Sequence, residues 1–170
     1  ELLQYREPKL KDEEIIKIID KISSIIKNDY DERVGDSKEL ALSALHDVSC
    51  PSNIAQEDIG TCAGTSIQTQ IAIREPIKYL DMLDSLAKNE NFDIDKGKSI
   101  TPNWTFDNYN DNSKRTISAS IMQNAIMNFA RGGGYDSSDN KTRDGLYSSQ
   151  VSTAYSSFFN KEVTSKFGTS

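Results

Sequence analysis

The sequence predicts a mainly helical fold with a few short strands, arranged as one lobe. Apolar residues recur at helical spacing in five separate segments, and Pro51 and Pro76 lie at boundaries between them. One further stretch, residues 92–110, has no helical period but carries aromatic side chains. With 170 residues and no internal repeat, the chain is long enough for one domain with a real core.

An amphipathic helix of about five turns is predicted at residues 11–28, which read KDEEIIKIIDKISSIIKN. Its first residues are acidic and its last are basic, as the helix dipole favours. Six isoleucines are expected on one apolar stripe, with the charged residues opposite: Ile15, Ile16, Ile19, Ile22, Ile25 and Ile26. We expect residues 1–36 to form an N-terminal unit around this helix, which acts either as a pro-segment or as a helix that binds a partner.

A second helix is predicted at residues 37–48, with Asp36 or Ser37 as its cap and a face of leucine and alanine. It cannot continue through the SCPSN segment that follows. The reason is Pro51, because the residue before a proline is pushed away from helical geometry.

Two consecutive helices are predicted on either side of Pro76. One begins near Cys62 and ends before this proline, and the other takes Pro76 into its first turn, where a missing N–H group costs nothing. Their buried positions are expected to be Ile67, Ile71, Ala72, Ile77, Leu80, Leu83 and Leu86. Three polar residues of the first helix are expected on its other sides: Gln68, Gln70 and Arg74.

In the last part of the chain, one helix is predicted, and two other segments have two expected structures each. Residues 92–110 are expected to form a short strand or an extended loop that carries Trp104 and Phe106. A fifth helix is predicted from Thr116 to a stop at Gly132, and its apolar residues are Ile117, Ile121, Met122, Ala125, Ile126 and Phe129. A glycine-rich loop follows it. Helix and strand are equally expected for residues 146–167.

Charge and composition exclude several classes of function. A net charge of -6 and an isoelectric point near 4.9 argue against nucleic acid or an anionic membrane as the main partner, because either needs a basic face. His46 is the only histidine, so we expect no metal site, and no cofactor is implied. Cys50 and Cys62 can pair or stay free, which leaves the compartment open. We prefer a secreted or host-directed protein to a cytoplasmic one.

Cys62 carries the clearest chemical signal. We expect it at the start of a helix, where unpaired N–H groups and the positive end of the helix dipole favour a thiolate. Such positions lower the pKa of a cysteine from about 8.5 to roughly 3.5–7.5, usually with help from a histidine. Gly60 permits a tight turn into this helix. Gln56 carries a side-chain amide that can donate to a developing oxyanion, beside the N–H group of Cys62.

The pattern Gln56-x3-Gly60-x-Cys62, followed directly by a helix, resembles the nucleophile segment of papain-like cysteine peptidases. The resemblance covers about seven positions, and Ala63 departs from it, because the family often has an aromatic residue there. It implies that Gln56 is the oxyanion donor and Cys62 the nucleophile. Residues 37–170 would then be the helical, cysteine-bearing lobe of a papain-like α+β fold, incomplete at its C-terminal end. The fifth helix and its loop also resemble those of large bacterial proteins.

The general base is missing from this pattern. In papain-like enzymes the histidine follows the cysteine on a second, β-rich lobe, but no histidine follows Cys62. His46 comes before it, next to Asp47, and its neighbours Leu42 and Leu45 indicate a packed helix face. We expect a structural or surface role for His46. The chain does not begin with methionine, so we expect it to be trimmed at this end, and we expect the catalytic histidine downstream of this chain or on another one.

The expected function is therefore that of a papain-like cysteine peptidase or acyl-hydrolase. Its substrate would be a peptide or a protein, and a second chain or a downstream domain would supply the base. Two alternatives stay open. The protein is a degenerate relative that keeps the lobe as a binding domain, or the motif is a coincidence in a non-catalytic helical interaction module that uses the isoleucine stripe.

Overall fold

The computed structural model describes residues 2–4, 6–57, 59–95, 97–103, 113–137 and 145–162. The α-helices of these segments are α1 (Asp12–Lys27), α2 (Ser37–Ser49), α3 (Cys62–Arg74), α4 (Pro76–Ala87), α5 (Ile117–Arg131) and α6 (Ser148–Phe159). The strands are β1 (Phe92–Asp95) and β2 (Lys98–Ile100), and the short 3-10 helices are η1 (Leu2–Gln4) and η2 (Pro51–Asn53). The prediction of a mainly helical fold with a few short strands is confirmed.

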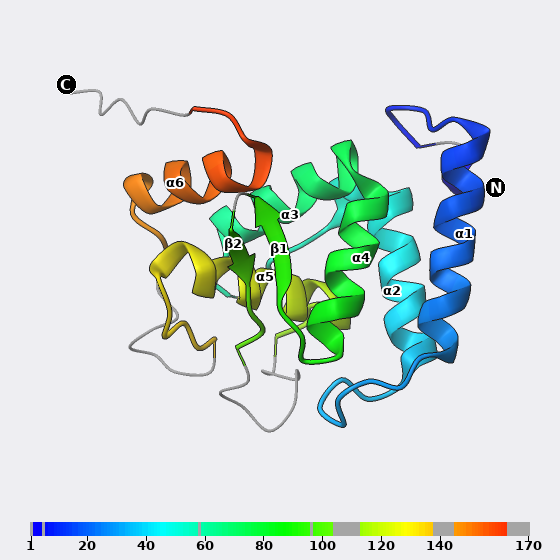
Figure 1. The fold of residues 1–170 in the computed structure, drawn as a ribbon, viewed down its shortest axis with the longest axis horizontal. Helices are drawn as coiled ribbons and strands as arrows, with labels where there is room; N and C mark the ends of the chain where they lie inside the picture. The colour runs from blue at the N-terminus through cyan, green and yellow to red at the C-terminus, as the bar shows by residue number, and fades with distance from the viewer. Residues whose placement is uncertain are drawn as a thin grey trace.

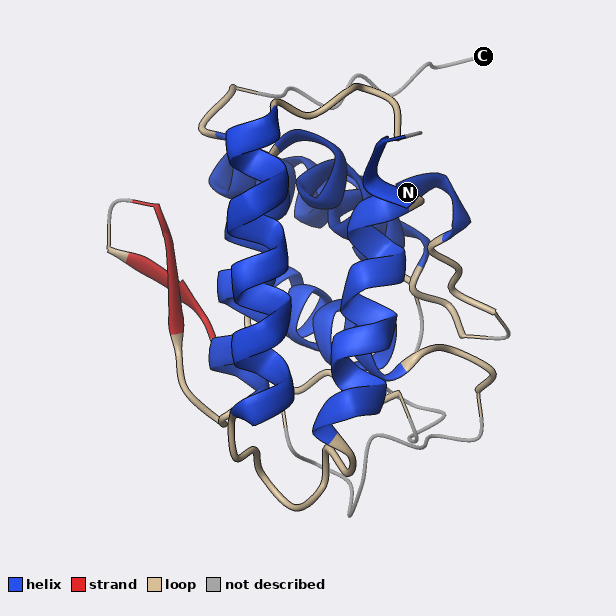
Figure 2. Cartoon of the chain, turned by 90° about the vertical axis from the view of Figure 1, so that its right-hand side faces the viewer, coloured by secondary structure: helices blue, strands red, loops and turns tan. Residues whose placement is uncertain are grey.

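The helices form one body with α1 at one end and α6 at the other (Figure 1). The β1–β2 hairpin is antiparallel, pairs Phe92 with Ile100, and lies at an edge of the helical body (Figure 2). None of the described helices is long and apolar enough to cross a membrane. Trp104 and Phe106 lie outside the described residues, so their predicted place in a strand or loop stays a prediction.

The predicted amphipathic helix is α1, and it packs against α2 and α4. Its apolar stripe is buried on one side only, and Ile18, which the prediction left out of the stripe, lies on that buried side. Ile18 and Ile25 are buried, whereas Ile16, Ile19 and Ile26 are 60%, 52% and 43% exposed. Six isoleucines cover a wider arc of the helix than two neighbouring helices can cover, so one side of the stripe remains in solvent.

The boundaries of α2 follow the predicted signals. The carboxylate of Asp36 accepts a hydrogen bond from the backbone N–H of Lys38 (2.9 Å), which satisfies one donor of the first turn. The helix ends at Ser49, and Cys50 leaves helical geometry directly before Pro51. η2 then begins at the proline, a short element that the sequence did not predict.

α3 packs against α2, α4, α5 and α6. It meets α5 at Gly64, where a Cβ atom would lie 3.1 Å from Cγ of Met127. The glycine therefore allows the two helices to approach closely. Ile67 and Ile71 are buried as predicted, but Gln68 is buried too, so its predicted place outside the core is wrong.

α5 begins and ends where the sequence predicts. The hydroxyl of Thr116 accepts a hydrogen bond from the backbone N–H of Ala119 (3.3 Å), and Gly132 stops the helix with a left-handed φ of 77°. Residues 118–127 are buried on all sides of the helix, including the polar ones. This complete burial is the structural basis of the site described below.

The serine- and aromatic-rich end of the chain forms a helix in its described part. α6 packs against α3 and α5, and the ring of Phe158 meets that of Phe129 edge to face, with 5.5 Å between ring centroids. The guanidinium of Arg74, at the end of α3, lies 5.3 Å from the centre of the Phe159 ring. These contacts stabilise the helical conformation of Ser148–Phe159 over a strand.

Candidate thiol site at the start of α3

Cys62 is the first residue of α3, and its side chain is exposed. Thr61 stands at the cap position, but its side chain makes no capping hydrogen bond to the first turn. The N–H groups of the first turn therefore donate to no cap side chain, and Cys62 lies at the positive end of the helix dipole. The hydroxyl of Ser66 donates to the carbonyl of Cys62 (2.9 Å), which ties this first turn to the next one.

Gln56 lies in the loop between η2 and α3, and its side chain is partly exposed. Two buried apolar residues, Ile54 and Ile59, fix this loop on either side of it. Glu57 adopts a left-handed φ of 51°, so the chain turns sharply directly after the glutamine. The loop thus presents Gln56 at the surface between two anchored points.

A buried amide, that of Gln123 on α5, connects both ends of this loop. Its Oε1 accepts a hydrogen bond from the hydroxyl of Thr61 (2.7 Å), and its Nε2 donates to the carbonyl of Ala55 (3.0 Å). Gln123 and Thr61 have no exposed surface. We call residues 56–62 the thiol segment. Gln123 therefore holds this segment at Ala55, directly before Gln56, and at Thr61, directly before Cys62.

The hydrogen bonds continue from Gln123 into the core. Nε2 of Gln123 donates to Oε1 of Gln68 (3.0 Å), and Nε2 of Gln68 donates to the hydroxyl of Tyr79 (2.8 Å). Tyr79 donates to Oδ2 of Asp47 (2.6 Å), which also accepts from the hydroxyl of Ser118 (2.5 Å). All five side chains are buried. We call the set Thr61, Gln123, Gln68, Tyr79, Asp47 and Ser118 the buried polar chain.

Burial is the largest influence on the pKa values of Asp47 and Tyr79, at the far end of the buried polar chain. It raises the pKa of Asp47 above its ordinary value, although hydrogen bonds from Ser118 and Tyr79 oppose the rise. Burial also raises the pKa of Tyr79, and the neighbouring carboxylate of Asp47 raises it further. Tyr79 therefore stays neutral and keeps the proton that it donates.

His46 does not lie in a packed helix face, which corrects the expectation based on its neighbours. Its side chain is 48% exposed, and Leu42 is 68% exposed on the same helix. Nδ1 of His46 is 3.9 Å from Oδ1 of Asp47, too long for a hydrogen bond. A surface role for His46 agrees with this position.

The two cysteines are free thiols in the structure. Cys50 is partly buried at the end of α2, whereas Cys62 is exposed. Within the described residues, no group of three or more histidine, cysteine, aspartate or glutamate side chains is arranged to hold a metal ion.

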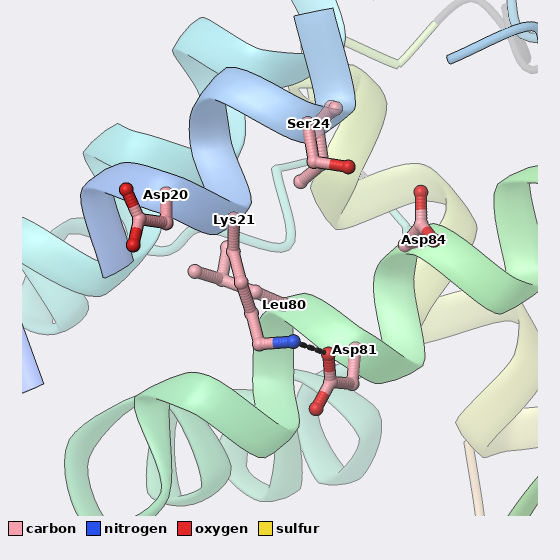
Figure 3. A pocket seen from close by; sticks show the side chains of 7 residues that line it. Asp20, Lys21, Ser24, Leu80, Asp81 and Asp84 are labelled. Atoms are coloured by element: carbon pink, nitrogen blue, oxygen red, sulfur yellow. Dashed lines mark hydrogen bonds and ion pairs between the residues drawn. The ribbon is translucent and has the colours of Figure 1, made fainter. Parts of the chain in front are cut away.

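Two surface hollows lie away from Cys62 and Gln56. One, of about 180 Å³, lies between α1 and α4, and there Lys21 forms an ion pair with Asp81 (Figure 3). Asp84 also lines it and accepts hydrogen bonds from Lys88, Tyr30 and Asn28. Burial opposes ionisation of Asp84, but these hydrogen bonds together lower its pKa.

The other hollow, of about 470 Å³, is more open and lies between the β1–β2 hairpin and α6. Its lining is rich in hydroxyl groups and includes Lys98, whose ammonium donates to Ser157 (2.9 Å). Neither hollow is lined by a residue of the thiol segment.

The sequence prediction missed the polar side chains behind the thiol segment. Gln68 was placed outside the core, and Gln123 and Ser118 were not singled out. A usable signal was present in α5, which carries no charged residue before Arg131: such a helix can be buried on all sides, and its polar residues must then find internal partners. Comparison with known proteins adds no assignment, since no protein-family model, curated protein or solved structure matches this chain.

Proposed function

We propose that this chain is the thiol-bearing lobe of a papain-like cysteine hydrolase. Cys62 is the nucleophile, Gln56 donates to the oxyanion, and a histidine downstream of this chain or on another chain acts as the base. The observation that carries the proposal is the exposed thiol of Cys62 at the first position of an enclosed helix whose cap side chain is turned away. An exposed nucleophile on a rigid helix start is the arrangement that acyl transfer needs.

The reaction follows from these positions. The sulfur of Cys62 adds to the carbonyl carbon of a peptide or isopeptide bond, and the proton of the thiol passes to the histidine. The oxygen becomes an oxyanion that accepts hydrogen bonds from the Gln56 amide and the Cys62 N–H group. The C–N bond then breaks as the histidine protonates the leaving amine, which leaves a thioester. Addition of water to the thioester releases the acid and restores the thiol.

Packing supports a fixed position for the nucleophile. α3 is enclosed by four other helices, and Gly64 brings its first turn close against α5. Arg6 binds the other end of the helix, because its Nη2 donates to the carbonyls of Ala72 and Ile73 (both 2.5 Å). A helix held at both ends loses little entropy when a substrate binds at its start.

The test adds the missing base. The chain alone should show no peptidase activity, and joining it to the segment or partner chain that carries the histidine should restore turnover. Cys62→Ala should then abolish turnover without loss of folding. Gln56→Ala should lower turnover by roughly 10²–10³, the usual effect of removing one oxyanion donor. Gln70→Ala, on the same helix as the thiol, is the matched control. Full turnover in Cys62→Ala would refute the proposal.

A second candidate function has its own observation. Four large apolar side chains of the first two helices are exposed, at 60%, 52%, 43% and 68%: Ile16, Ile19, Ile26 and Leu42. We call them the α1–α2 apolar residues. A contiguous patch of such groups is typical of surfaces that bind another protein, and Ile16, Ile19 and Ile26 lie along one side of α1. They favour the reading as a helical interaction module, either beside catalysis or in place of it.

A further inference from the structure

We propose that Gln123 is the positioning residue of the thiol segment, because it fixes the spacing between Gln56 and Cys62 from the other side of the α3–α5 contact. The inference rests on the proposed roles of Gln56 and Cys62. Gln123 does not touch a substrate in this account; it acts through Ala55 and Thr61, the residues directly before each functional side chain.

The amide of Gln123 uses its complete hydrogen-bonding capacity. Oε1 accepts from Thr61 (2.7 Å) and from Nη1 of Arg115 (3.0 Å), while Nε2 donates to Ala55 (3.0 Å) and to Gln68 (3.0 Å). A glutamine amide offers two acceptor sites and two donors, so none is left over. Such a group has one favourable position and resists displacement.

The orientation of this amide follows from its partners. Arg115 can only donate, so the group that faces it must be the oxygen. The carbonyl of Ala55 can only accept, so the group that faces it must be the nitrogen. A flipped amide would place donor against donor and acceptor against acceptor. The same logic orients Gln68, whose oxygen must face the Gln123 nitrogen.

The buried polar chain explains why the residue is a glutamine. Its position is fully buried, where a charged side chain is expensive and an apolar one would leave the Ala55 carbonyl and the Gln68 oxygen without donors. Tyr79, Asp47 and Ser118 continue the hydrogen bonds on the far side. The loop is thus anchored to a rigid network that spans α2, α3, α4 and α5.

Gln123 also controls the start of α3. It takes the hydroxyl of Thr61 as a donor, and this hydroxyl makes no capping bond to the first turn. A threonine at this position ordinarily accepts from a first-turn N–H group. By holding the hydroxyl away, Gln123 leaves the positive helix start to the thiol of Cys62.

Hydrogen exchange in the full 170-residue chain measures directly how firmly Gln123 holds the loop before α3. In Gln123→Met, the backbone amides of residues 54–64 should exchange about tenfold faster or more, because a lost buried hydrogen bond makes local opening easier. The matched control is Asn124→Leu. Asn124 is equally buried on α5 and donates to the carbonyl of Asn103 (3.2 Å), away from the thiol segment. Equal exchange in the two variants would overturn the proposal.

Variants of Thr61 test the Thr61–Gln123 hydrogen bond without altering the core of α5. Thr61→Ser keeps the hydroxyl and should exchange like the wild type. Thr61→Val removes it and should exchange faster over the same residues, about fivefold or more. If the two variants exchange equally, the Thr61–Gln123 bond does not hold the segment and the proposal fails, even where Gln123→Met does not fold.

A labelling experiment tests whether Gln123 affects the reactivity of the Cys62 thiol. Alkylation of Cys62 at about pH 6 should be several-fold slower in Gln123→Met than in the wild type, because the freed Thr61 hydroxyl can cap the helix and compete for its N–H groups. Asn124→Leu should leave the rate unchanged. A rate in Gln123→Met equal to that of the wild type would overturn the link to the thiol.

The two measurements separate the two proposals. If wild-type Cys62 labels like an ordinary thiol, the proposed hydrolase function fails. The exchange data would then still decide whether Gln123 holds the loop.

Discussion

Asp47 is the residue at which burial and hydrogen bonding oppose each other most directly. Its carboxyl accepts from Tyr79 and Ser118, yet it is only 2% exposed, and burial raises its pKa above the ordinary value of 3.8. A raised pKa means that the folded state binds this proton more tightly than the unfolded state. The contribution of Asp47 to the free energy of unfolding is therefore largest below pH 3.8 and falls as the pH rises through the folded-state pKa.

We predict that Asp47→Asn is at least as stable as the wild type at neutral pH. The amide oxygen can still accept from Tyr79 and Ser118, and no buried charge remains. Below pH 3.8 the two proteins should have similar free energies of unfolding, because the wild-type carboxyl is then protonated as well. Urea unfolding across this pH range measures the difference.

Asp47→Ala is the contrasting variant. It leaves the hydroxyls of Tyr79 and Ser118 without their acceptor and should cost about 1–3 kcal/mol for each at any pH. If Asp47→Asn loses more stability at neutral pH than in acid, the carboxylate charge stabilises the fold and our sign for the pKa shift is wrong.

At the scale of elements, α3 is the helix whose two ends are held by distant segments. Its first turn is fixed through Gln123, and its last carbonyls accept from Arg6, which is 2% exposed. A guanidinium at a helix C-terminus satisfies carbonyls that have no partner within the helix and interacts favourably with the dipole. Two of its nitrogens, Nε and Nη1, have no partner among the described residues, and burial lowers the pKa of Arg6 while Glu14 opposes this.

We predict that Arg6→Met lowers the free energy of unfolding by about 1–3 kcal/mol, the usual cost of leaving a buried hydrogen-bonding group without its partner. The larger loss would apply if the two carbonyls of α3 stayed buried, and the smaller if water reached them. Lys9→Met is the matched control, because Lys9 is exposed in the same segment. Thermal unfolding of both variants measures the effect. An Arg6→Met protein as stable as Lys9→Met would show that α3 needs no cap at this end.

Most helices could be predicted because their signals are local. Pro76 separates α3 from α4, Thr116 and Gly132 bound α5, and an apolar period fills each interior. What could not be predicted depends on which elements meet in space. The exposed side of α1 follows from the two helices that cover it, and the burial of Gln68 follows from the position of α5. Neither feature can be inferred from the periodicity of one helix alone.

The candidate site shows the same division. Cys62 at a helix start and Gln56 before it could be found from the sequence, because the turn, the small residues and the helix are contiguous. Gln123 could not be assigned its role, because it lies 61 residues after Cys62 and 68 after Ala55, and only the packing of α5 on α3 brings it to the loop.

At the scale of the whole molecule, the α1–α2 apolar residues are a part of the described surface that does not suit an isolated chain. We predict that the chain either associates with itself or binds a dye that senses exposed apolar surface. The triple variant Ile16→Gln, Ile19→Gln and Leu42→Gln should reduce whichever occurs, while Lys17→Gln, exposed on α1, should not. Sedimentation velocity and dye fluorescence measure the two cases. A monomer that binds no dye would contradict the interaction surface.

The reactivity of Cys62 tests the central claim most directly. In the folded wild-type chain, iodoacetamide at about pH 6 should modify Cys62 far faster than Cys50, by about tenfold or more after each rate is divided by its value in the unfolded chain. His46→Ala should leave this rate nearly unchanged, since the proposed function assigns activation of the thiol to the helix start and an external histidine, not to His46. Slow labelling of both cysteines to the same extent, or a Cys50–Cys62 disulfide in protein from its natural compartment, would contradict the account.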